Sequence, residues 1–239
     1  MKKSKKYVSY FSGTEISIWL FSVVLIVGSF LAFDGEGYLA MIASVLGATS
    51  LIFVAKGNPI GQVLIIIFSL IYAYISFGFA YYGEMITYLG MSAPMAALAL
   101  FSWLRNPYNG KRSEVKIYSI KRRDVISMIC FAIPVTVAFY FILSYFSTSN
   151  ILPSTFSVAT SFVAVYLTYK RSPYYALAYA VNDIVLIVLW GLATAEDISY
   201  ISVLVCFITF LVNDIYGFLN WLRMERRQGE NSMDDANQV

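Results

Sequence analysis

The chain has 239 residues, of which 59% are hydrophobic and only 13% are charged. Soluble domains carry about 25% charged residues, so this composition excludes an ordinary soluble domain and indicates an integral membrane protein. The net charge is +3, and the sequence contains no histidine, which removes the commonest metal ligand and near-neutral acid–base group. Both cysteines, Cys130 and Cys206, fall inside apolar runs, where we expect packing rather than a disulfide. We therefore expect no cofactor, no bound metal and no nucleic-acid partner.

Eight apolar runs follow one another along the chain, and most have about the length that a helix needs to cross a hydrocarbon core of ~30 Å. A basic N-terminal arm precedes them, and a polar tail from Gln228 onward is expected to be disordered. The runs cover residues 16–33, 38–55, 60–79, 85–104, 125–146, 153–169, 174–193 and 198–222.

The charges alternate from one connecting segment to the next. All 17 Lys and Arg residues fall in the N-terminal arm, the turns at 56–59 and 170–173, the 105–123 loop and the segment after residue 222. The four intervening turns contain no Lys or Arg, and their charged residues are Asp34, Glu36, Glu84, Glu196 and Asp197. Because basic residues collect on the cytoplasmic side, this pattern predicts eight spans with both termini in the cytoplasm.

Short motifs recur in the same order in the two halves of the chain. Lys56-x-x-Pro59 matches Lys170-x-x-Pro173, and Trp103-Leu-Arg105 matches Trp221-Leu-Arg223. The order predicts two parallel three-helix repeats joined by a linker helix, a known transporter plan with the substrate near the midplane. The predicted units are an N-terminal arm with an extra helix (1–37), the first repeat (38–104), a loop and linker helix (105–150), the second repeat (151–222) and a tail (223–239).

The seventh run carries polar groups at its centre, where Asn182 and Asp183 are adjacent. An ionised carboxylate at that depth costs at least ~2.5 kcal/mol, so it should face a protein interior or a wet cavity. Helical spacing places Tyr179, Asp183 and Trp190 on one face, with Tyr175 and Asn182 on the adjacent one. We therefore expect this helix to contribute to a binding site.

The same Val-Asn-Asp triplet recurs in the eighth run, where it contains Asn213 and Asp214. From the helical rise, Asn182 lies ~13 Å and Asn213 ~15 Å from the inner ends of their helices. Tyr216 shares the Asn213 face. We predict that these side chains also contribute to the site.

The first repeat offers a matching polar stripe, with a kink expected at Pro94. Aromatic rings stack on flat solutes and attract cations, while amides donate and accept hydrogen bonds, so the lining suits a flat, polyhydroxylated solute. Trp103 and Trp221 lie beside arginines, as is typical of an interfacial aromatic belt. The stripe consists of Gln62, Ser69, Tyr72, Tyr88 and Ser92.

Several segments resemble the PnuC proteins, which are bacterial nicotinamide riboside transporters. They are Gly57-Asn-Pro-Ile-Gly-Gln62, Tyr82-Gly-Glu-Met-Ile-Thr-Tyr88, Ser102-Trp-Leu-Arg-Asn-Pro107, Asn182 and Tyr216-Gly217-x-x-x-Trp221. The resemblance covers about Tyr38 to Arg227. It implies an all-α, SWEET-like 3+1+3 fold with an extra N-terminal helix, a homotrimer in the bacterial inner membrane, and facilitated diffusion of nicotinamide riboside. Phosphorylation inside the cell would trap the riboside.

One departure from that family leaves alternatives open. Many members carry Trp-x-x-Trp at the start of the seventh span, where this chain has Tyr175 and Ala178. The stacking ring could instead come from Tyr175, Tyr179 or Trp190. Related transporters take thiamine or riboflavin, and a substrate-binding subunit with an energising partner is a further alternative. A membrane enzyme is disfavoured, since no Gly-rich phosphate loop is present.

Overall fold

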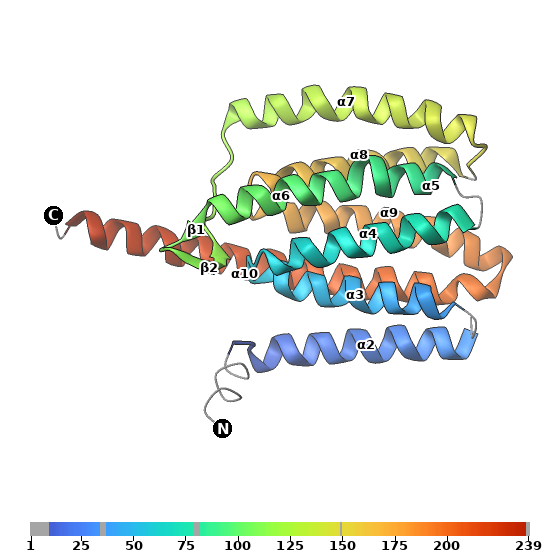
Figure 1. Cartoon of the computed structure of the whole chain (residues 1–239), viewed down its shortest axis with the longest axis horizontal. Helices are drawn as coiled ribbons and strands as arrows, with labels where there is room; N and C mark the ends of the chain where they lie inside the picture. The colour runs from blue at the N-terminus through green and yellow to red at the C-terminus, as the bar shows by residue number, and fades with distance from the viewer. Residues whose placement is uncertain (1–9, 34–36, 79–81, 149, 238–239) are drawn as a thin grey trace.

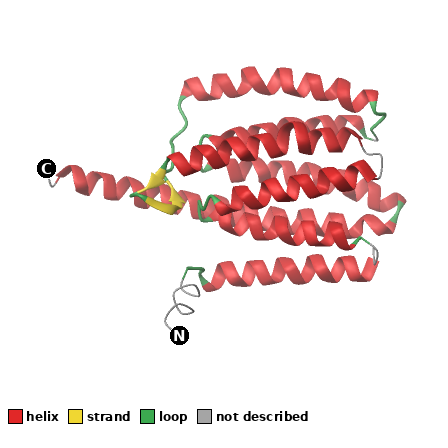
Figure 2. Cartoon of the chain, in the orientation of Figure 1, coloured by secondary structure: helices red, strands yellow, loops and turns green. Residues whose placement is uncertain are grey.

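The computed structural model describes residues 10–33, 37–78, 82–148 and 150–237. In these ranges it is a bundle of helices with one small β-hairpin (Figure 2). Within the described residues, eight helices are long and apolar enough to span a membrane, which confirms the eight predicted spans. The spanning helices are α2 (Gly13–Phe33), α3 (Tyr38–Ala55), α4 (Ile60–Gly78), α5 (Tyr82–Thr87) continuing into α6 (Ala93–Arg105), α7 (Arg122–Tyr145), α8 (Ile151–Tyr169), α9 (Tyr174–Glu196) and α10 (Ile201–Asn237).

The two Lys-x-x-Pro motifs form the same turn twice. After α3, Gly57 adopts a left-handed conformation with φ of 65°, and after α8, Arg171 does so with φ of 59°. In the first turn Asn58 N donates to Phe53 O at 3.0 Å, and in the second Ser172 N donates to Leu167 O at 3.0 Å. These bonds satisfy carbonyls that a helix end leaves without partners. The equivalence of the turns supports the sequence repeat at the level of the backbone.

The fourth span is interrupted near Pro94, as the sequence predicts. A π-helical turn at Tyr88–Ser92 separates α5 from α6. Proline has no backbone N–H to donate one turn back, so the regular helical ladder is disturbed at this point. Wider turns of this kind are frequent at functional sites.

The helices form two groups that contact each other reciprocally. One group contains α3, α4 and α5–α6, and the other contains α8, α9 and α10. The third helix of each group packs on the first helix of the other, α6 on α8 and α10 on α3. Helix α2 lies outside this arrangement, against α3 and α10 (Figure 1).

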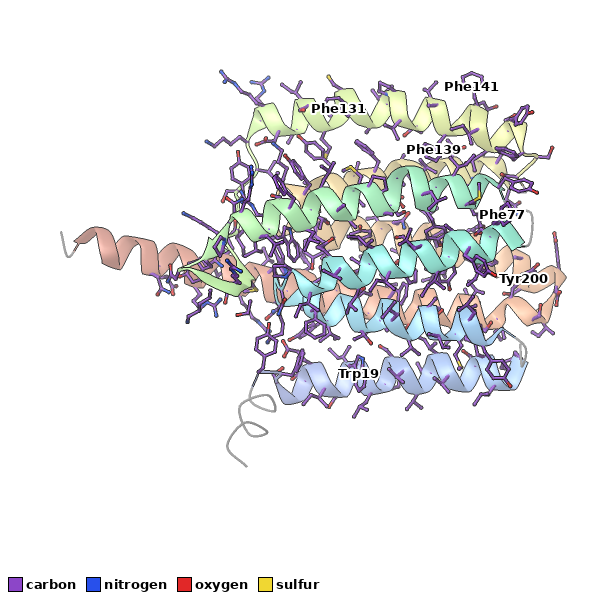
Figure 3. All side chains as sticks on the ribbon, in the orientation of Figure 1. Trp19, Phe77, Phe131, Phe139, Phe141 and Tyr200 are labelled. Carbon is purple, nitrogen blue, oxygen red and sulfur yellow. The ribbon has the colours of Figure 1, made fainter. Side chains whose placement is uncertain are left out.

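Helix α7 is the least buried span and packs mainly on α8. Phe139 points toward the bundle and is 8% exposed, whereas Phe141 points away and is 66% exposed (Figure 3). An apolar outward face suits contact with lipid or another subunit.

The two ends of the bundle differ in charge. The basic end, as we call it, contains the turns at 56–59 and 170–173, the hairpin and the far end of α10 (Figure 1). The opposite, acidic end contains Glu84, Glu196 and Asp197. The expected basic arm at residues 2–6 and the acidic turn at 34–36 lie outside the described residues.

Two sequence predictions at the basic end are wrong. The segment 105–123 is not a loop throughout, because β1 (Pro107–Tyr108) and β2 (Lys111–Val115) pair as an antiparallel hairpin. The tail does not become disordered at Gln228, because α10 continues to Asn237. Gln228 is buried, accepts a hydrogen bond from Ile117 N at 2.9 Å and donates to Val115 O at 3.1 Å. This amide holds the hairpin against the helix, so the polar segment stays ordered.

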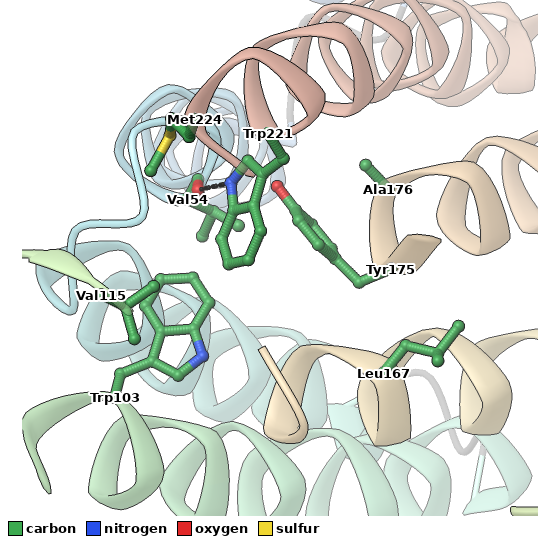
Figure 4. Packing of buried hydrophobic residues seen from close by; sticks show 8 residues of the cluster. All are labelled: Val54, Trp103, Val115, Leu167, Tyr175, Ala176, Trp221 and Met224. Carbon is green, nitrogen blue, oxygen red and sulfur yellow. Dashed lines mark hydrogen bonds between the residues drawn. The ribbon is translucent and has the colours of Figure 1, made fainter. Parts of the chain in front are cut away.

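The aromatic-belt interpretation of Trp103 and Trp221 is also wrong. The two side chains are 1% and 0% exposed, and their ring centroids lie 5.5 Å apart in the interior (Figure 4). Each indole N–H donates to a backbone carbonyl of the other helix group, which draws the ring inward rather than toward the membrane surface. Val115 and Tyr175 belong to the same buried cluster.

Candidate functional site: a cavity between the helix groups

A cavity of about 460 Å³ lies between the two helix groups. Its volume falls in the range of ~300–1,000 Å³ that is usual for small-molecule sites. Its lining reaches the acidic end, where Glu84, Thr148 and Ser199 contribute. Toward the basic end the lining stops at residues such as Val54 and Thr168, which belong to the ends of α3 and α8.

The structure brings most of the predicted site residues together around this one cavity. They come from α4, the π-helical turn, α9 and α10, segments that are far apart in the sequence. The predicted residues in the lining are Gln62, Ser69, Tyr72, Tyr88, Ser92, Tyr175, Tyr179, Asn182, Asp183, Trp190 and Asp214.

Asn213 and Tyr216 are not part of the lining. Asn213 Nδ2 donates to Ser22 Oγ of α2 at 2.9 Å, and Tyr216 OH donates to Glu15 Oε1 of α2 at 3.1 Å. Successive residues on a helix are turned by about 100°, so Asp214 faces the cavity while its neighbour faces α2. Similar depth therefore did not imply the same face, and both residues serve helix packing.

Asn182 is held by the hydroxyl groups of α8. Its Oδ1 accepts hydrogen bonds from Ser157 at 3.1 Å, Thr160 at 2.8 Å and Ser161 at 3.1 Å. Asn182 is also part of the cavity lining, so its Nδ2 is the group that remains to donate to a ligand. A carbonyl oxygen has only two lone pairs, so at any moment one of these hydroxyls is free for another partner.

Ser157 and Ser161 also line the cavity, and the sequence analysis did not identify them. Their four-residue spacing in the sixth span was the available signal, since that spacing places two side chains on one helix face.

The charged part of the lining is acidic. It contains Glu84, Asp183 and Asp214, and within the described residues no Lys or Arg side chain lines the cavity. Asp183 and Asp214 are each 4% exposed, and their side chains lie close enough to share a hydrogen bond. Two ionised carboxylates this close would repel each other in an apolar interior, so the pair suits a shared proton or a nearby cation.

Three buried polar atoms of the lining have no hydrogen-bond partner within the described residues. They are Gln62 Nε2, Ser69 Oγ and Asp183 Oδ2. A buried polar group without a partner costs ~1–3 kcal/mol, so these atoms favour occupation of the cavity by water or a polar ligand. No group of His, Cys, Asp and Glu side chains that could hold a metal ion is found in the described part of the chain.

Aromatic rings cover the wall formed by α4 and the π-helical turn. The ring centroids of Tyr72 and Tyr88 are 5.4 Å apart, and Phe68 stands 4.7 Å from Tyr72. The Tyr72 hydroxyl shares a hydrogen bond with Ser44 Oγ at 3.0 Å, which fixes the orientation of the ring. Phe68 was missed because the sequence analysis followed polar residues along this helix.

The three aromatic rings considered for stacking on a ligand differ in burial and in position along the cavity. Tyr175 is 1% exposed and packs edge-on against Trp221, with 4.8 Å between centroids. Trp190 lies nearer the acidic end, 5.5 Å from Tyr200. Tyr179 lines the cavity between these levels, which makes it the best placed of the three to meet a ligand beside Asp183.

A membrane-spanning bundle of two reciprocal three-helix groups, around a cavity that contains several polar side chains, is typical of the class of small-solute transporters. A model of the nicotinamide mononucleotide transporter family matches residues 37–223, and the chain belongs to this family. This match confirms the family resemblance and places the chain among transporters rather than enzymes.

Curated relatives and a solved structure agree with this assignment. The nicotinamide riboside transporter PnuC of Neisseria mucosa is 25% identical over 215 residues, which cover 88% of this chain and 82% of the relative. The protein of the same name from Haemophilus influenzae is 24% identical over 227 residues, covering 93% and 96%. The crystal structure of the vitamin B3 transporter PnuC matches with a TM-score of 0.76 at 24% identity, over 91% of this chain and 94% of that one. The structural match shows a shared fold.

Proposed function

We propose that this protein carries nicotinamide riboside across the bacterial inner membrane by facilitated diffusion. The observation that carries the proposal is the cavity lining, which combines aromatic rings, hydroxyls, an amide donor and acidic side chains. Nicotinamide riboside offers a matching set of a cationic aromatic ring, a carboxamide and ribose hydroxyls. The names of the two curated relatives support the same substrate.

The charge of the lining favours the riboside over its mononucleotide. A phosphate group would bring negative charge beside Asp183 and Asp214, and the described lining offers no Lys or Arg to compensate. Two like charges 4 Å apart repel by about 4 kcal/mol at an effective dielectric constant of 20. The cationic ring of the riboside would be attracted by the same carboxylates.

The arrangement in the membrane follows from the charge pattern. We propose that the basic end faces the cytoplasm, so that the cavity opens to the outside and the riboside leaves toward a kinase that traps it. We also propose that residues 38–104 and 151–222 are the two repeats, with α7 as linker. The exposed outer face of α7 is available for assembly of a homotrimer.

A binding titration tests the substrate. The purified protein is titrated by calorimetry with nicotinamide riboside, nicotinamide, nicotinamide mononucleotide and thiamine. We expect the riboside to bind at least tenfold more tightly than each of the others. Equal affinity for the mononucleotide would refute the charge argument, and tighter binding of thiamine would assign the chain to another vitamin.

Uptake into proteoliposomes tests the mechanism. With no second protein and no ATP, labelled riboside should equilibrate across the membrane and exchange with unlabelled riboside on the other side. A requirement for an added protein would instead identify a substrate-binding subunit with an energising partner.

A further inference from the structure

The third helices of the two groups carry matched dipeptides at the basic end, Ser102-Trp103 in α6 and Asn220-Trp221 in α10. Trp103 Nε1 donates to Thr168 O at 2.9 Å, and Trp221 Nε1 donates to Val54 O at 2.9 Å. Each indole thus reaches the last turn of the first helix of the opposite group. The acceptors are equivalent, since Val54 and Thr168 each lie two residues before the lysine of a Lys-x-x-Pro motif.

The residues that precede the tryptophans repeat the pattern. Ser102 Oγ donates to Tyr169 O at 2.9 Å, and Asn220 Nδ2 donates to Ala55 O at 2.8 Å. Carbonyls at helix C-termini have no partner within the helix, so they are available to accept these bonds. We name the four donor side chains and their four carbonyl acceptors the reciprocal clamp.

The clamp lies beside one end of the cavity. Tyr175 belongs to the cavity lining, and Trp221 packs directly against it. Trp103 lies against Trp221, and Val115 of the hairpin is fully buried in the same cluster (Figure 4). A solute that leaves the cavity toward the basic end has to pass this layer of rings.

A strap of residues 106–121 joins both halves of the clamp. Val115 N donates to Gly57 O at 2.9 Å, and Tyr118 N donates to Arg171 O at 3.0 Å. Gly57 and Arg171 are the left-handed residues of the two equivalent turns. Since the strap contacts both turns, a separation of the two helix groups at this end would also disturb the strap.

We propose that the reciprocal clamp is the gate that closes the transport cavity at the basic end. The inference rests on the proposed function only in that the cavity carries a solute through the membrane. When the two groups separate here, all four cross-group hydrogen bonds break together and water replaces them on the carbonyls. Each hydrogen bond contributes little net free energy, because water replaces the partner when the bond breaks. The closed state of the gate is therefore favoured, but it can still open.

Trp103 and Trp221 act in this scheme as positioning residues, because neither lines the cavity. Replacement of either by Phe retains an aromatic ring but removes the N–H donor. Loss of one such bond shifts an equilibrium by about three- to tenfold. The variants should therefore open more often toward the basic end while the substrate site stays unchanged.

The chain contains its own reporter for the test. Cys206 lies in the cavity lining, whereas Cys130 is exposed on α7 and is replaced by Ser. A membrane-impermeant thiol reagent is applied to vesicles of each orientation, and modification of Cys206 is followed by mass. In this parent protein we expect reaction from the acidic side to be at least tenfold faster than from the basic side. Equal rates from both sides would overturn the proposal without any gate variant.

The two gate variants are then compared with a matched control. Trp103→Phe and Trp221→Phe should each raise the basic-side rate about three- to tenfold, with the acidic-side rate and the riboside Kd within twofold of the parent. Trp19→Phe removes a similar indole bond, to Thr49 Oγ1 at 3.0 Å, that is not one of the four bonds of the clamp, and should leave every rate unchanged. The proposal is overturned by unchanged basic-side rates in folded gate variants, or by an equal increase in the control.

The labelling experiment does not depend on the identity of the solute. If the parent does not bind riboside but Cys206 shows the expected side preference and variant effects, the gate proposal is supported and the substrate assignment is refuted. If riboside binds and the side preference is missing, the substrate assignment stands and the gate falls.

Discussion

Replacement of Asn182 by Ala separates two roles that the structure gives to one amide. Oδ1 anchors α9 to the hydroxyls of α8. Asn182 also lines the cavity, where its Nδ2 is the proposed donor to the substrate. The variant therefore removes a structural contact and a proposed substrate contact together. We expect a moderate loss of stability and a larger loss of riboside affinity.

The loss of folding stability in Asn182→Ala is limited by the number of hydrogen bonds that Asn182 Oδ1 can accept. Two lone pairs allow only two of the three hydroxyl contacts at full strength, and a neutral hydrogen bond contributes about 0.5–1.5 kcal/mol. Thr160 keeps alternative acceptors in Phe156 O at 3.1 Å and Ser157 O at 3.0 Å. The free energy of unfolding should therefore fall by about 1–2 kcal/mol. Loss of the Nδ2 contact to the riboside should cost a further ~1–3 kcal/mol of binding, or about 5- to 150-fold in Kd.

Thermal unfolding without ligand and calorimetric titration measure the two parts separately. The matched control is Thr160→Val, which removes the shortest contact to Oδ1, at 2.8 Å, but leaves the Asn182 amide and the cavity-lining Ser157 and Ser161 in place. It should lose similar stability and retain riboside affinity within about threefold. A folded Asn182→Ala protein with an unchanged Kd would refute the assignment of Nδ2 to the substrate.

Three further predictions concern charge and topology. Asp183→Asn should raise the calorimetric Kd of the cationic riboside about tenfold or more, because the carboxylate charge attracts the cation. The Kd of neutral nicotinamide should change less than threefold, and an equal loss of affinity for both ligands would contradict this prediction. Cysteines placed at Ser113 and Asp197 should react with an impermeant reagent from opposite sides of the membrane, and labelling from one side would contradict the topology. Glu15→Ala should lower the thermal stability by about 2–3 kcal/mol, since Glu15 is nearly buried and pairs with Lys56 at 3.0 Å. Adding Lys56→Met should recover part of that loss, and no recovery would show that the ion pair is not its cause.

The spans and the repeat were predictable because each depends on features that are local in the sequence. A hydrocarbon core requires long apolar helices, so length and composition identify them. The Lys-x-x-Pro motif was recognised because it occurs twice in the sequence, and in the structure its two copies form equivalent turns with the same hydrogen bonds. Asn182 and Asp183 were found because polar groups are rare at such depth.

The remaining errors have a common physical cause, which is that the partner of each group lies far away in the sequence. Asn213 was assigned to the cavity by its depth, but the face it uses is set by α2 and Ser22. Trp103 and Trp221 were assigned to the membrane surface by their arginine neighbours, but distant carbonyls hold them inside. Gln228 was assigned to a disordered tail, although the backbone of Val115 and Ile117 provides its partners.

The cavity wall and the clamp differ in symmetry, and this difference follows from what each has to do. Two helix groups that move against each other can use equivalent contacts on both sides, and the clamp has them in Trp103 and Trp221. A riboside has no twofold symmetry, so two identical half-sites would leave some of its groups without partners. At matched positions after the two prolines the chain has Gly61, where a side chain would meet Val54, and Tyr175, whose ring contacts the cavity. The repeat is thus retained in the clamp that we propose to move and lost in the cavity wall that we propose to recognise an asymmetric molecule.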